Sequence, residues 1–259
     1  MDRLNIQAAM LLEKSAKEKL AELNRLKSEF VSHVSHELKN PLTSITLSVN
    51  NLLDGIPEKP KPGIENYLKM IQECSTHLEH MITNLLDITK IEADKIDIHL
   101  EKINVKEYFQ SVKKVIIPLA QKKKISIKEN IAHNMYIYAD KNWLRTIFIN
   151  LIDNAIKYTD DKDTIYIQAG ISSENLNKDD SSHLVDISVI DQGRGIPVSK
   201  QKIIFKQFER LKESPKQRKH GLGLGLYIVQ KLILLHGGKI KVKSSPGEGS
   251  TFTFTLPGV

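Results

Sequence analysis

The octapeptide SHELKNPL occupies residues 35–42, and three glycine-bearing segments follow more than a hundred residues later. These are DQGRGI at 191–196, GLGLGL at 221–226 and GEG at 247–249. The octapeptide lies among apolar residues at helical spacing, whereas the glycine segments adjoin short alternating runs or begin a helical one. The chain therefore predicts a helical part followed by a part that mixes helices and strands.

The first part reads as a helical hairpin. Apolar residues recur at near-heptad spacing from Leu12 to Phe30 and continue to Leu52, which indicates a coiled coil running into one long helix that ends near Asp54. Residues 55–63 hold two glycines and three prolines and predict a loop. A second heptad stripe follows from Tyr67 to Ile88. Because one hairpin cannot bury both stripes, we expect two hairpins to pair as a four-helix bundle in a homodimer.

After about Asp97 the pattern changes to alternating apolar runs separated by helical stretches. We expect strands around 125–127, 165–167, 185–189 and 252–256, helices at 105–121, 143–157 and 224–236, and a polar loop at 172–182. This interleaving predicts an α+β layered domain.

Composition excludes several classes of protein. No run of about 18 apolar residues occurs and the N-terminus lacks the layout of a signal peptide, so we expect no membrane contact by this segment. The single cysteine, Cys74, excludes an intramolecular disulfide framework and suits a reducing cytoplasm. The formal charge of +7 comes from lysines spread along the chain, which argues against nucleic-acid binding.

His36 is the candidate reactive residue of the octapeptide. It faces away from the apolar stripe, a neutral imidazole is a nucleophile, and Glu37 beside it could accept its proton. Asn40 lies one turn further along the same face, where its amide could hold a water. The simpler alternative is a surface histidine on a helix, which is how we interpret His33.

A second polar set lies on the predicted helix 143–157. Asn150, Asn154 and Lys157 occur at i, i+4 and i+7 and therefore share one face, with Tyr158 directly after them. An amide oxygen of Asn154 would suit Mg²⁺, and Lys157 would suit phosphate charge.

Asp191 and the glycine segments complete this candidate site. Asp191 follows a strand, where its carboxylate could accept a hydrogen bond from an exocyclic amine such as that of adenine, and Gly193 and Gly195 allow a base to approach closely. The segment 221–226 leaves glycine amides and a helix N-terminus facing phosphates. Its spacing is neither that of a Walker A loop nor that of a Rossmann fingerprint.

Two further segments lie on either side of GLGLGL, one before it and one after it. Phe205 and Phe208, which could be core anchors alone, precede a basic run at 209–220 that is typical of a mobile lid or of a solvated loop. Arg210 is the candidate for stabilising transferred charge. We interpret GEG at 247–249 as a structural hairpin.

In their order along the chain, these motifs resemble the H, N, G1, F and G2 boxes of bacterial sensor histidine kinases. The resemblance implies a coiled-coil linker helix at 1–29, a dimerisation and phosphotransfer hairpin at 30–97, and a catalytic ATP-binding domain at 98–259. That last domain would be an α+β two-layer sandwich of the Bergerat (GHKL) type.

The resemblance also implies an activity. ATP with Mg²⁺ would phosphorylate His36, and the phosphoryl group would pass to an aspartate of a response-regulator receiver domain; Asn40 matches the HExxN/T phosphatase pattern. The catalytic residues would be His36, Glu37, Asn40 and Arg210, and the metal ligand Asn154. The nucleotide-binding residues would be Asn150, Asn154, Lys157, Tyr158, Asp191, Gly193, Gly195, Ile196, Phe208, Gly221, Leu222, Gly223, Leu224 and Gly225.

Two rival functions fit parts of the pattern. One is a dimeric signalling scaffold that binds ATP without transferring phosphate, and the other is a stand-alone ATPase of the same superfold. Asn150 stands where those ATPases carry a glutamate that activates water, and an amide cannot act as that base, so the ATPase is the weaker rival. The resemblance also allows a membrane-anchored full-length protein whose cytoplasmic part includes this segment.

Overall fold

The computed structural model describes residues 34, 38–52, 62–93, 95–173, 183–209 and 222–259. The expected coiled coil at 12–30, the basic run at 210–220 and most of the predicted loops at 55–63 and 172–182 lie outside these residues. Contacts divide the chain into two compact units, 1–83 with 220–222 and 84–219 with 223–259, and each is described by itself.

The first unit contains most of the predicted hairpin, whose second helix continues into the second unit. Residues 38–52 are helical, and α2 spans Pro62–Glu92, which confirms the helix expected from the second heptad stripe. Ser48 Oγ donates a hydrogen bond to Met70 Sδ at 3.3 Å, so the two helices lie side by side. The prediction that the loop extends through Gly63 is wrong: α2 already begins at Pro62, because a proline in the first turn has no amide that the helix needs.

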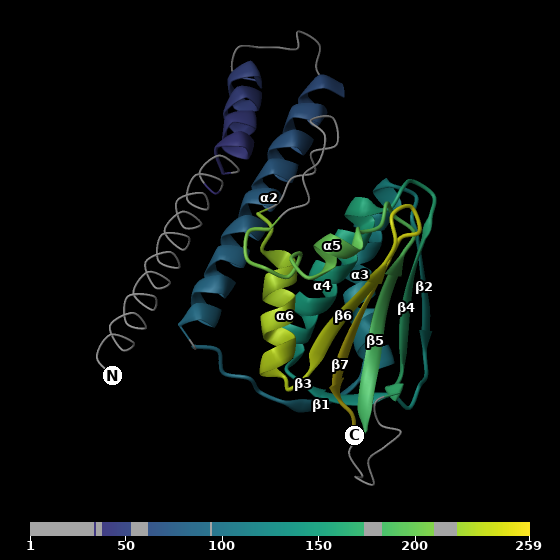
Figure 1. Ribbon diagram of the computed structural model, residues 1–259. Coiled ribbons are helices and arrows are strands. Elements are labelled where there is room, and N and C mark those ends of the chain that lie inside the picture. Colours follow the sequence, from purple (N-terminus) through teal and green to yellow (C-terminus); the bar gives the residue numbers. More distant parts are fainter. Residues whose placement is uncertain (1–33, 35–37, 53–61, 94, 174–182, 210–221) are drawn as a thin grey trace, which may run out of the picture. The chain divides into compact units, whose positions relative to one another are not determined.

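The second unit is an α+β two-layer sandwich, as predicted (Figure 1). One sheet has the strand order β2-β4-β5-β7-β6, in which β2 runs parallel to β4 and the other neighbours are antiparallel. Helices α3, α4 and α6 cover one face of this sheet. Strands β1 and β3 form a separate antiparallel pair. The elements are β1 Glu101–Asn104, α3 Val105–Lys122, β2 Ser126–Ile131, β3 Tyr136–Ala139, α4 Lys141–Tyr158, β4 Thr164–Ile171, β5 Leu184–Asp191, α5 Val198–Gln201, α6 Gly225–Leu235, β6 Lys239–Ser244 and β7 Ser250–Pro257.

Alternation of side chains fixes which face of the sheet is buried. In β5 every second residue is buried, and the same apolar face continues into β4 and β7. Phe148 of α4 packs on this face with its ring centroid 5.7 Å from that of Phe254 and 5.6 Å from that of Phe109 on α3. The core therefore lies between the helix layer and the sheet.

The strands and helices expected after Asp97 are all present, but the sequence pattern missed β1, β3, β6 and the single turn of α5. Strands β1 and β3 have four residues each, too few for an alternating pattern to stand out. Strand β6 alternates lysines with Ile240 and Val242 at the edge of the sheet, where lysines hinder pairing with another chain.

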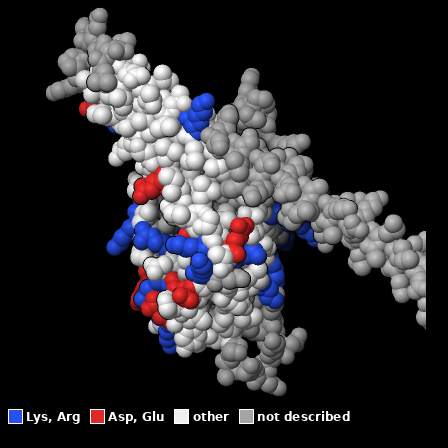
Figure 2. Space-filling view, turned by 90° about the vertical axis from the view of Figure 1, so that its left-hand side faces the viewer, with Lys and Arg blue, Asp and Glu red and all other residues white. Residues whose placement is uncertain are grey.

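The described surface carries mixed charge. Figure 2 shows basic and acidic side chains interspersed on the face that it draws. None of the described helices is both long enough and apolar enough to cross a lipid bilayer.

Candidate nucleotide-binding site

Helix α4 presents the predicted polar face. Asn154, Lys157 and Tyr158 are half-buried on its last turns, whereas Leu151 and Ile152 are buried in the core. Asn150 is buried, and its Nδ2 donates a hydrogen bond to the carbonyl oxygen of Thr146 at 2.9 Å. The predicted helix and its two-sided character are confirmed, because periodicity alone separates the two faces.

Asn150 also lies against the first residue of α6. A Cβ atom added at Gly225, the first residue of α6, would lie 2.6 Å from Asn150 Oδ1. Any larger residue at 225 would have to displace the Asn150 amide. Asn150 thus fixes the spacing between the helix with the polar face and the helix that begins at the glycine segment.

Asp191 ends β5 with its carboxylate held in a defined orientation. Oδ1 accepts hydrogen bonds from the backbone amides of Gly193 at 2.9 Å and Ser250 at 3.2 Å. Only 6% of the residue is exposed. Burial raises the pKa of the Asp191 carboxyl above its usual value, and the two amide donors partly oppose that rise. With Oδ1 bonded to the protein, Oδ2 is the oxygen suited to an amine donor from a ligand.

The turn after Asp191 packs against two other backbones. A Cβ atom at Gly193 would lie 2.4 Å from the carbonyl oxygen of Tyr158, so this turn touches the end of α4 directly. On the other side, a Cβ at Gly249 would lie 2.0 Å from the carbonyl oxygen of Asp191. The GEG segment is the β6–β7 hairpin turn, as predicted, but it also supports the Asp191 turn.

Ile196 is fixed by its backbone. Its amide donates to Ser244 Oγ at 2.8 Å, and Ser244 Oγ donates in turn to the carbonyl oxygen of Gly249 at 2.6 Å. Sequence inspection did not identify Ser244 or Ser250 as part of the site. The two glycines of the hairpin were the available signal, because closely spaced glycines mark places where backbones meet.

The start of α6 offers backbone amides to an anion. Its N-cap residue, Leu224, makes no side-chain capping bond, and the helix runs eleven residues from there. The Leu224 side chain is buried in the core, so any contact it makes with a ligand is through its backbone. Gly223 has φ +69°, a conformation that turns the chain into the helix, and Leu222 is half-buried. The first amides of a helix lack internal partners and carry partial positive charge, which favours phosphate.

Positive charge gathers near the end of α4. The guanidinium carbon of Arg194 lies 4.6 Å from the ring centroid of Tyr158, and Lys157 Nζ lies 5.6 Å from the same ring. Arg194 was missed in the sequence because it sits between two glycines and matches no residue pattern. Its stacking on the Tyr158 ring is a second contact between the Asp191 turn and α4, in addition to the packing of Gly193 on the Tyr158 carbonyl.

The two phenylalanines of the F-box segment differ in role. Phe205 is buried with its ring 6.4 Å from that of Phe252, so it anchors the core. Phe208 is half-buried and has φ +66°, which is uncommon for a bulky residue.

Two family models match the chain. Residues 26–94 match the family described as His Kinase A (phospho-acceptor) domain. Residues 139–259 match the family described as Histidine kinase-, DNA gyrase B-, and HSP90-like ATPase. The chain belongs to the sensor histidine kinases.

Among curated relatives, the kinase is 31% identical to an uncharacterized sensor-like histidine kinase of Rhizobium meliloti, over 97% of this chain and 47% of the relative. It is 30% identical to the circadian input-output histidine kinase CikA of Synechococcus elongatus, over 90% of this chain and 30% of the relative. The chain therefore spans less than half the length of these relatives.

Solved structures share the fold. Full-length ShkA in complex with AMPPNP matches with a TM-score of 0.62 and 26% identity, over 90% of this chain and 46% of that one. Acinetobacter baumannii histidine kinase AdeS matches with a TM-score of 0.63 at 23% identity, over 85% of this chain and 96% of that one.

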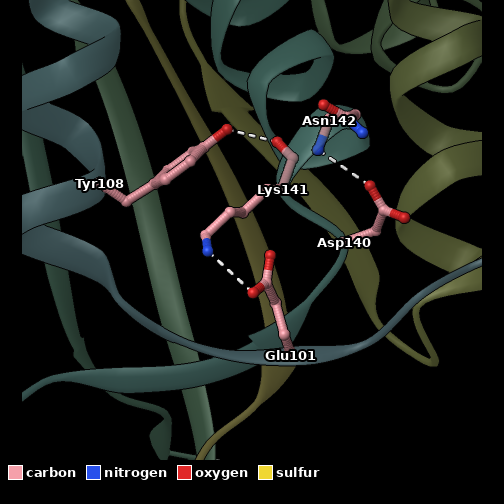
Figure 3. A network of polar contacts seen from close by, with 5 residues as sticks. All are labelled: Glu101, Tyr108, Asp140, Lys141 and Asn142. Carbon is pink, nitrogen blue, oxygen red and sulfur yellow. Dashed lines mark hydrogen bonds and ion pairs between the residues drawn. The ribbon is translucent and has the colours of Figure 1, made fainter.

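The start of α4 in the kinase is held by a polar network (Figure 3). Asp140 Oδ1 accepts hydrogen bonds from the amides of Asn142 at 2.9 Å and Trp143 at 3.2 Å, which caps the helix. Tyr108 Oη donates to the carbonyl oxygen of Lys141, whose ammonium pairs with Glu101 Oε2 at 2.8 Å. Burial raises the pKa of Tyr108, so the phenol stays protonated as the donor.

Buried His236 ties this network to α6. Its Nε2 accepts the backbone amide hydrogen of Asp140 at 3.0 Å, which requires the ring proton to be on Nδ1. Nδ1 then donates to the carbonyl oxygen of Leu232 at 2.6 Å. Helices α4 and α6 therefore meet here as well as at Asn150 and Gly225.

Four of the predicted site residues, His36, Glu37, Arg210 and Gly221, lie outside the described residues of the kinase. Asn40 is exposed on the helix 38–52 of the first unit, whereas the predicted nucleotide residues described above belong, apart from Leu222, to the second. The second unit therefore brings together α4, the Asp191 turn and the start of α6.

Asn154, half-buried on α4, carries an amide oxygen of the kind that Mg²⁺ binds. Within the described ranges, no cluster of three His, Cys, Asp or Glu residues could hold a metal ion. Mg²⁺ commonly takes one or two protein ligands and completes its shell with phosphate oxygens and water. The amide oxygen of Asn154 fits that donor set when a nucleotide supplies the phosphates.

Proposed function

We propose that this chain is the kinase part of a two-component sensor, which phosphorylates its own His36 from ATP and passes the phosphoryl group to a response-regulator aspartate. The observation that carries the proposal is Asp191, whose buried carboxylate is oriented by two backbone amides. The domain limits we propose are those of the sequence: a linker helix at 1–29, the hairpin at 30–97 and the catalytic domain at 98–259.

Each part of ATP has a chemically matched group in the second unit. Asp191 Oδ2 accepts a hydrogen bond from the adenine amine, and the glycine turn that orients this carboxylate packs directly against the end of α4. The amides at the start of α6 and the ammonium of Lys157 face the phosphates. Asn154 would hold Mg²⁺, which would supply positive charge to neutralise the phosphates. The 26% identical ShkA has been solved with AMPPNP, which supports a nucleotide at this site.

The transfer step follows from the chemistry of the histidine. A ring nitrogen of His36 attacks the γ-phosphorus, the bond from that phosphorus to the β,γ-bridging oxygen breaks, and ADP leaves. Glu37 accepts the proton released from the other ring nitrogen. Arg210 stabilises charge on the transferred group. The same phosphoryl group then moves from nitrogen to a carboxylate oxygen of the receiver domain, which regenerates the imidazole.

Asn150 favours transfer over hydrolysis. Its amide donates to Thr146 and its Oδ1 lies against Gly225, and an amide has no basicity with which to activate water. The rival ATPase would need such a base. Asn40, exposed on its helix, is the residue we propose for positioning a water during dephosphorylation of the regulator.

We also propose that the chain acts as a homodimer in the cytoplasm, where ATP is available. Apolar side chains are exposed along both hairpin helices, including Leu42, Leu47 and Leu68. Burial of such a surface in a four-helix bundle is the physical reason to pair. A membrane anchor elsewhere in the full-length protein is compatible with this arrangement.

The deciding experiment is labelling with γ-labelled ATP and Mg²⁺. We expect the wild-type chain to acquire acid-labile, alkali-stable label and His36→Gln to acquire none. His33→Gln is the matched control, because it removes a histidine three residues away and should leave the label intact. Label retained by His36→Gln would reject His36 as the acceptor.

The two rivals give different results in the same assay. ATP binding without label would favour the nucleotide-dependent scaffold. Steady release of phosphate without a labelled protein would favour the ATPase.

A further inference from the structure

Lys123, at the C-terminal end of α3, binds the end of a different helix. Its Nζ donates hydrogen bonds to the carbonyl oxygens of Ile156 at 2.8 Å, Thr159 at 3.0 Å and Lys157 at 3.3 Å. An ammonium group has three N–H donors, so these three acceptors use all of them. The lysine thus completes its hydrogen bonding on the last turn of α4.

This contact supplies what the end of α4 lacks by itself. The last four carbonyl groups of a helix have no partner within it and carry partial negative charge. Thr159, the C-cap residue, is extended rather than left-handed, so the chain leaves α4 without a glycine cap. A positive charge from α3 binds the carbonyl groups of Ile156 and Lys157 instead.

The backbone of Lys123 strengthens the same junction. Its carbonyl oxygen accepts a hydrogen bond from the amide of Lys162 at 3.1 Å, in the segment between α4 and β4. The α3 end itself is fixed by hydrogen bonds from the amides of Lys123 and Ile125 to the carbonyl oxygen of Ala120, at 3.1 and 3.0 Å. The backbone of Lys123 is therefore held by hydrogen bonds at both its amide and its carbonyl group.

The turn of α4 that Lys123 holds is the one that meets the nucleotide site. Lys157 lies on it, Asn154 directly precedes it, and the carbonyl oxygen of Tyr158 lies directly against Gly193. Lys123 binds the carbonyl groups on either side of Tyr158, so the last turn of α4 is fixed between α3 and the Asp191 turn. A displacement of this turn would move Gly193, and with it the orientation of Asp191.

We propose that Lys123 is a positioning residue of the nucleotide site, which acts through the last turn of α4 and touches no part of the nucleotide. The proposal rests on the function proposed above. Loss of the ammonium should loosen α4 after Asn154 and weaken ATP binding while the fold persists.

The test compares Lys123→Met with Lys124→Met in the full chain. Lys124 is the adjacent exposed lysine, so its replacement removes the same charge from the same turn. We expect Lys123→Met to raise the Kd for ATP about tenfold, which corresponds to about 1.4 kcal/mol, and Lys124→Met to leave it within about twofold. Binding is measured by titration calorimetry well below the unfolding temperature of each variant.

Two further readouts separate positioning from general stability. Lys123→Arg should regain most of the affinity, because a guanidinium can reach the same carbonyl groups. Amide hydrogen exchange should accelerate in peptides that cover 155–160 of Lys123→Met and not elsewhere in α4.

A Lys123→Met variant that unfolds at lower temperature yet binds ATP with wild-type affinity would overturn the proposal, since Lys123 would then serve stability alone. If the wild-type chain binds no ATP, the nucleotide site itself is rejected, and the Lys123 variants are not needed to show it.

Discussion

The helical hairpin and the α+β domain differ in whether their apolar side chains are buried within one chain. In the domain, Phe109, Phe148 and Phe254 are enclosed between one helix layer and one sheet. In the hairpin of a single chain, leucines on both helices are exposed: Leu68 of α2, for example, is 54% exposed. A two-helix hairpin has no second layer, so its apolar surface is available for association, whereas the domain closes its core within one chain.

Removing an enclosed ring should have the largest effect. We expect Phe148→Ala to lower the free energy of unfolding of the domain by about 3–5 kcal/mol, because it leaves a cavity among three aromatic rings. Urea unfolding can be followed by the fluorescence of Trp143, the chain's single tryptophan, which lies in α4. Leu119→Ala, on the exposed side of α3, is the control and should cost less than about 1 kcal/mol. Equal losses for the two variants would contradict the enclosed core.

A charge on the open surface of the hairpin should break association rather than folding. Leu68→Lys is expected to weaken the dimer at least about a hundredfold, or about 3 kcal/mol, since a lysine cannot be buried in the bundle. Leu234→Lys is a close match, because Leu234 of α6 is 56% exposed but belongs to the domain. Light scattering after size-exclusion chromatography should find the first variant monomeric and the second dimeric. A dimeric Leu68→Lys would show that the hairpin associates through another face.

Within the closed core of the domain, the buried carboxyl of Asp191 is less stable in its charged form than it would be in water. Burial raises its pKa, so the carboxyl stabilises the fold fully only below its unfolded pKa, and this contribution is lost as pH rises through the folded pKa. Asp191→Asn retains an oxygen for the amides of Gly193 and Ser250 but offers no carboxylate to adenine. We expect about a hundredfold weaker ATP binding with no loss of unfolding free energy at neutral pH.

Calorimetry and urea unfolding of Asp191→Asn across pH test both expectations. As pH falls through the raised pKa of Asp191, the free energy of unfolding of the wild type should increase relative to that of the variant. A variant that unfolds more easily than the wild type at neutral pH would show that the carboxylate stabilises the fold.

Breaking an ion pair on the domain surface should change the free energy of unfolding least, and the more exposed pair should contribute less than the more buried one. Lys141 and Glu101, drawn in Figure 3, are about half exposed, and we expect Lys141→Met to change the free energy of unfolding by less than about 0.5 kcal/mol. Lys113 and Glu129 pair at 3.0 Å with less exposure, so Lys113→Met should cost more. Urea unfolding in low and high salt measures the difference, and the reverse ranking would refute it.

Much of the candidate site follows from local pattern. Asn150, Asn154 and Lys157 share a face because the helical period places them there, and that face could be read from the sequence. Asp191 stood out because it ends a strand and begins a glycine turn. The long helices and the four strongly alternating strands could be predicted for the same reason.

The partners of these residues could not be read in that way. Ser250 lies 59 residues after the carboxylate to which its amide donates, and Lys123 lies 33 residues before the first carbonyl that it binds. Neither serine nor lysine carries a distinctive local signal, and hydrogen bonds to backbone depend on where a chain passes rather than on which residue it carries.

The sequence by itself therefore determined the two kinds of architecture, a helical hairpin and an α+β domain, and the order of the motifs along them, because periodicity and short motifs are local properties. Tertiary structure alone decided that α3 caps α4 through Lys123, that the β6–β7 turn orients Asp191, and that Gly225 seats α6 against Asn150. These contacts join segments distant in the chain, and only packing of the layers brings them within hydrogen-bond distance.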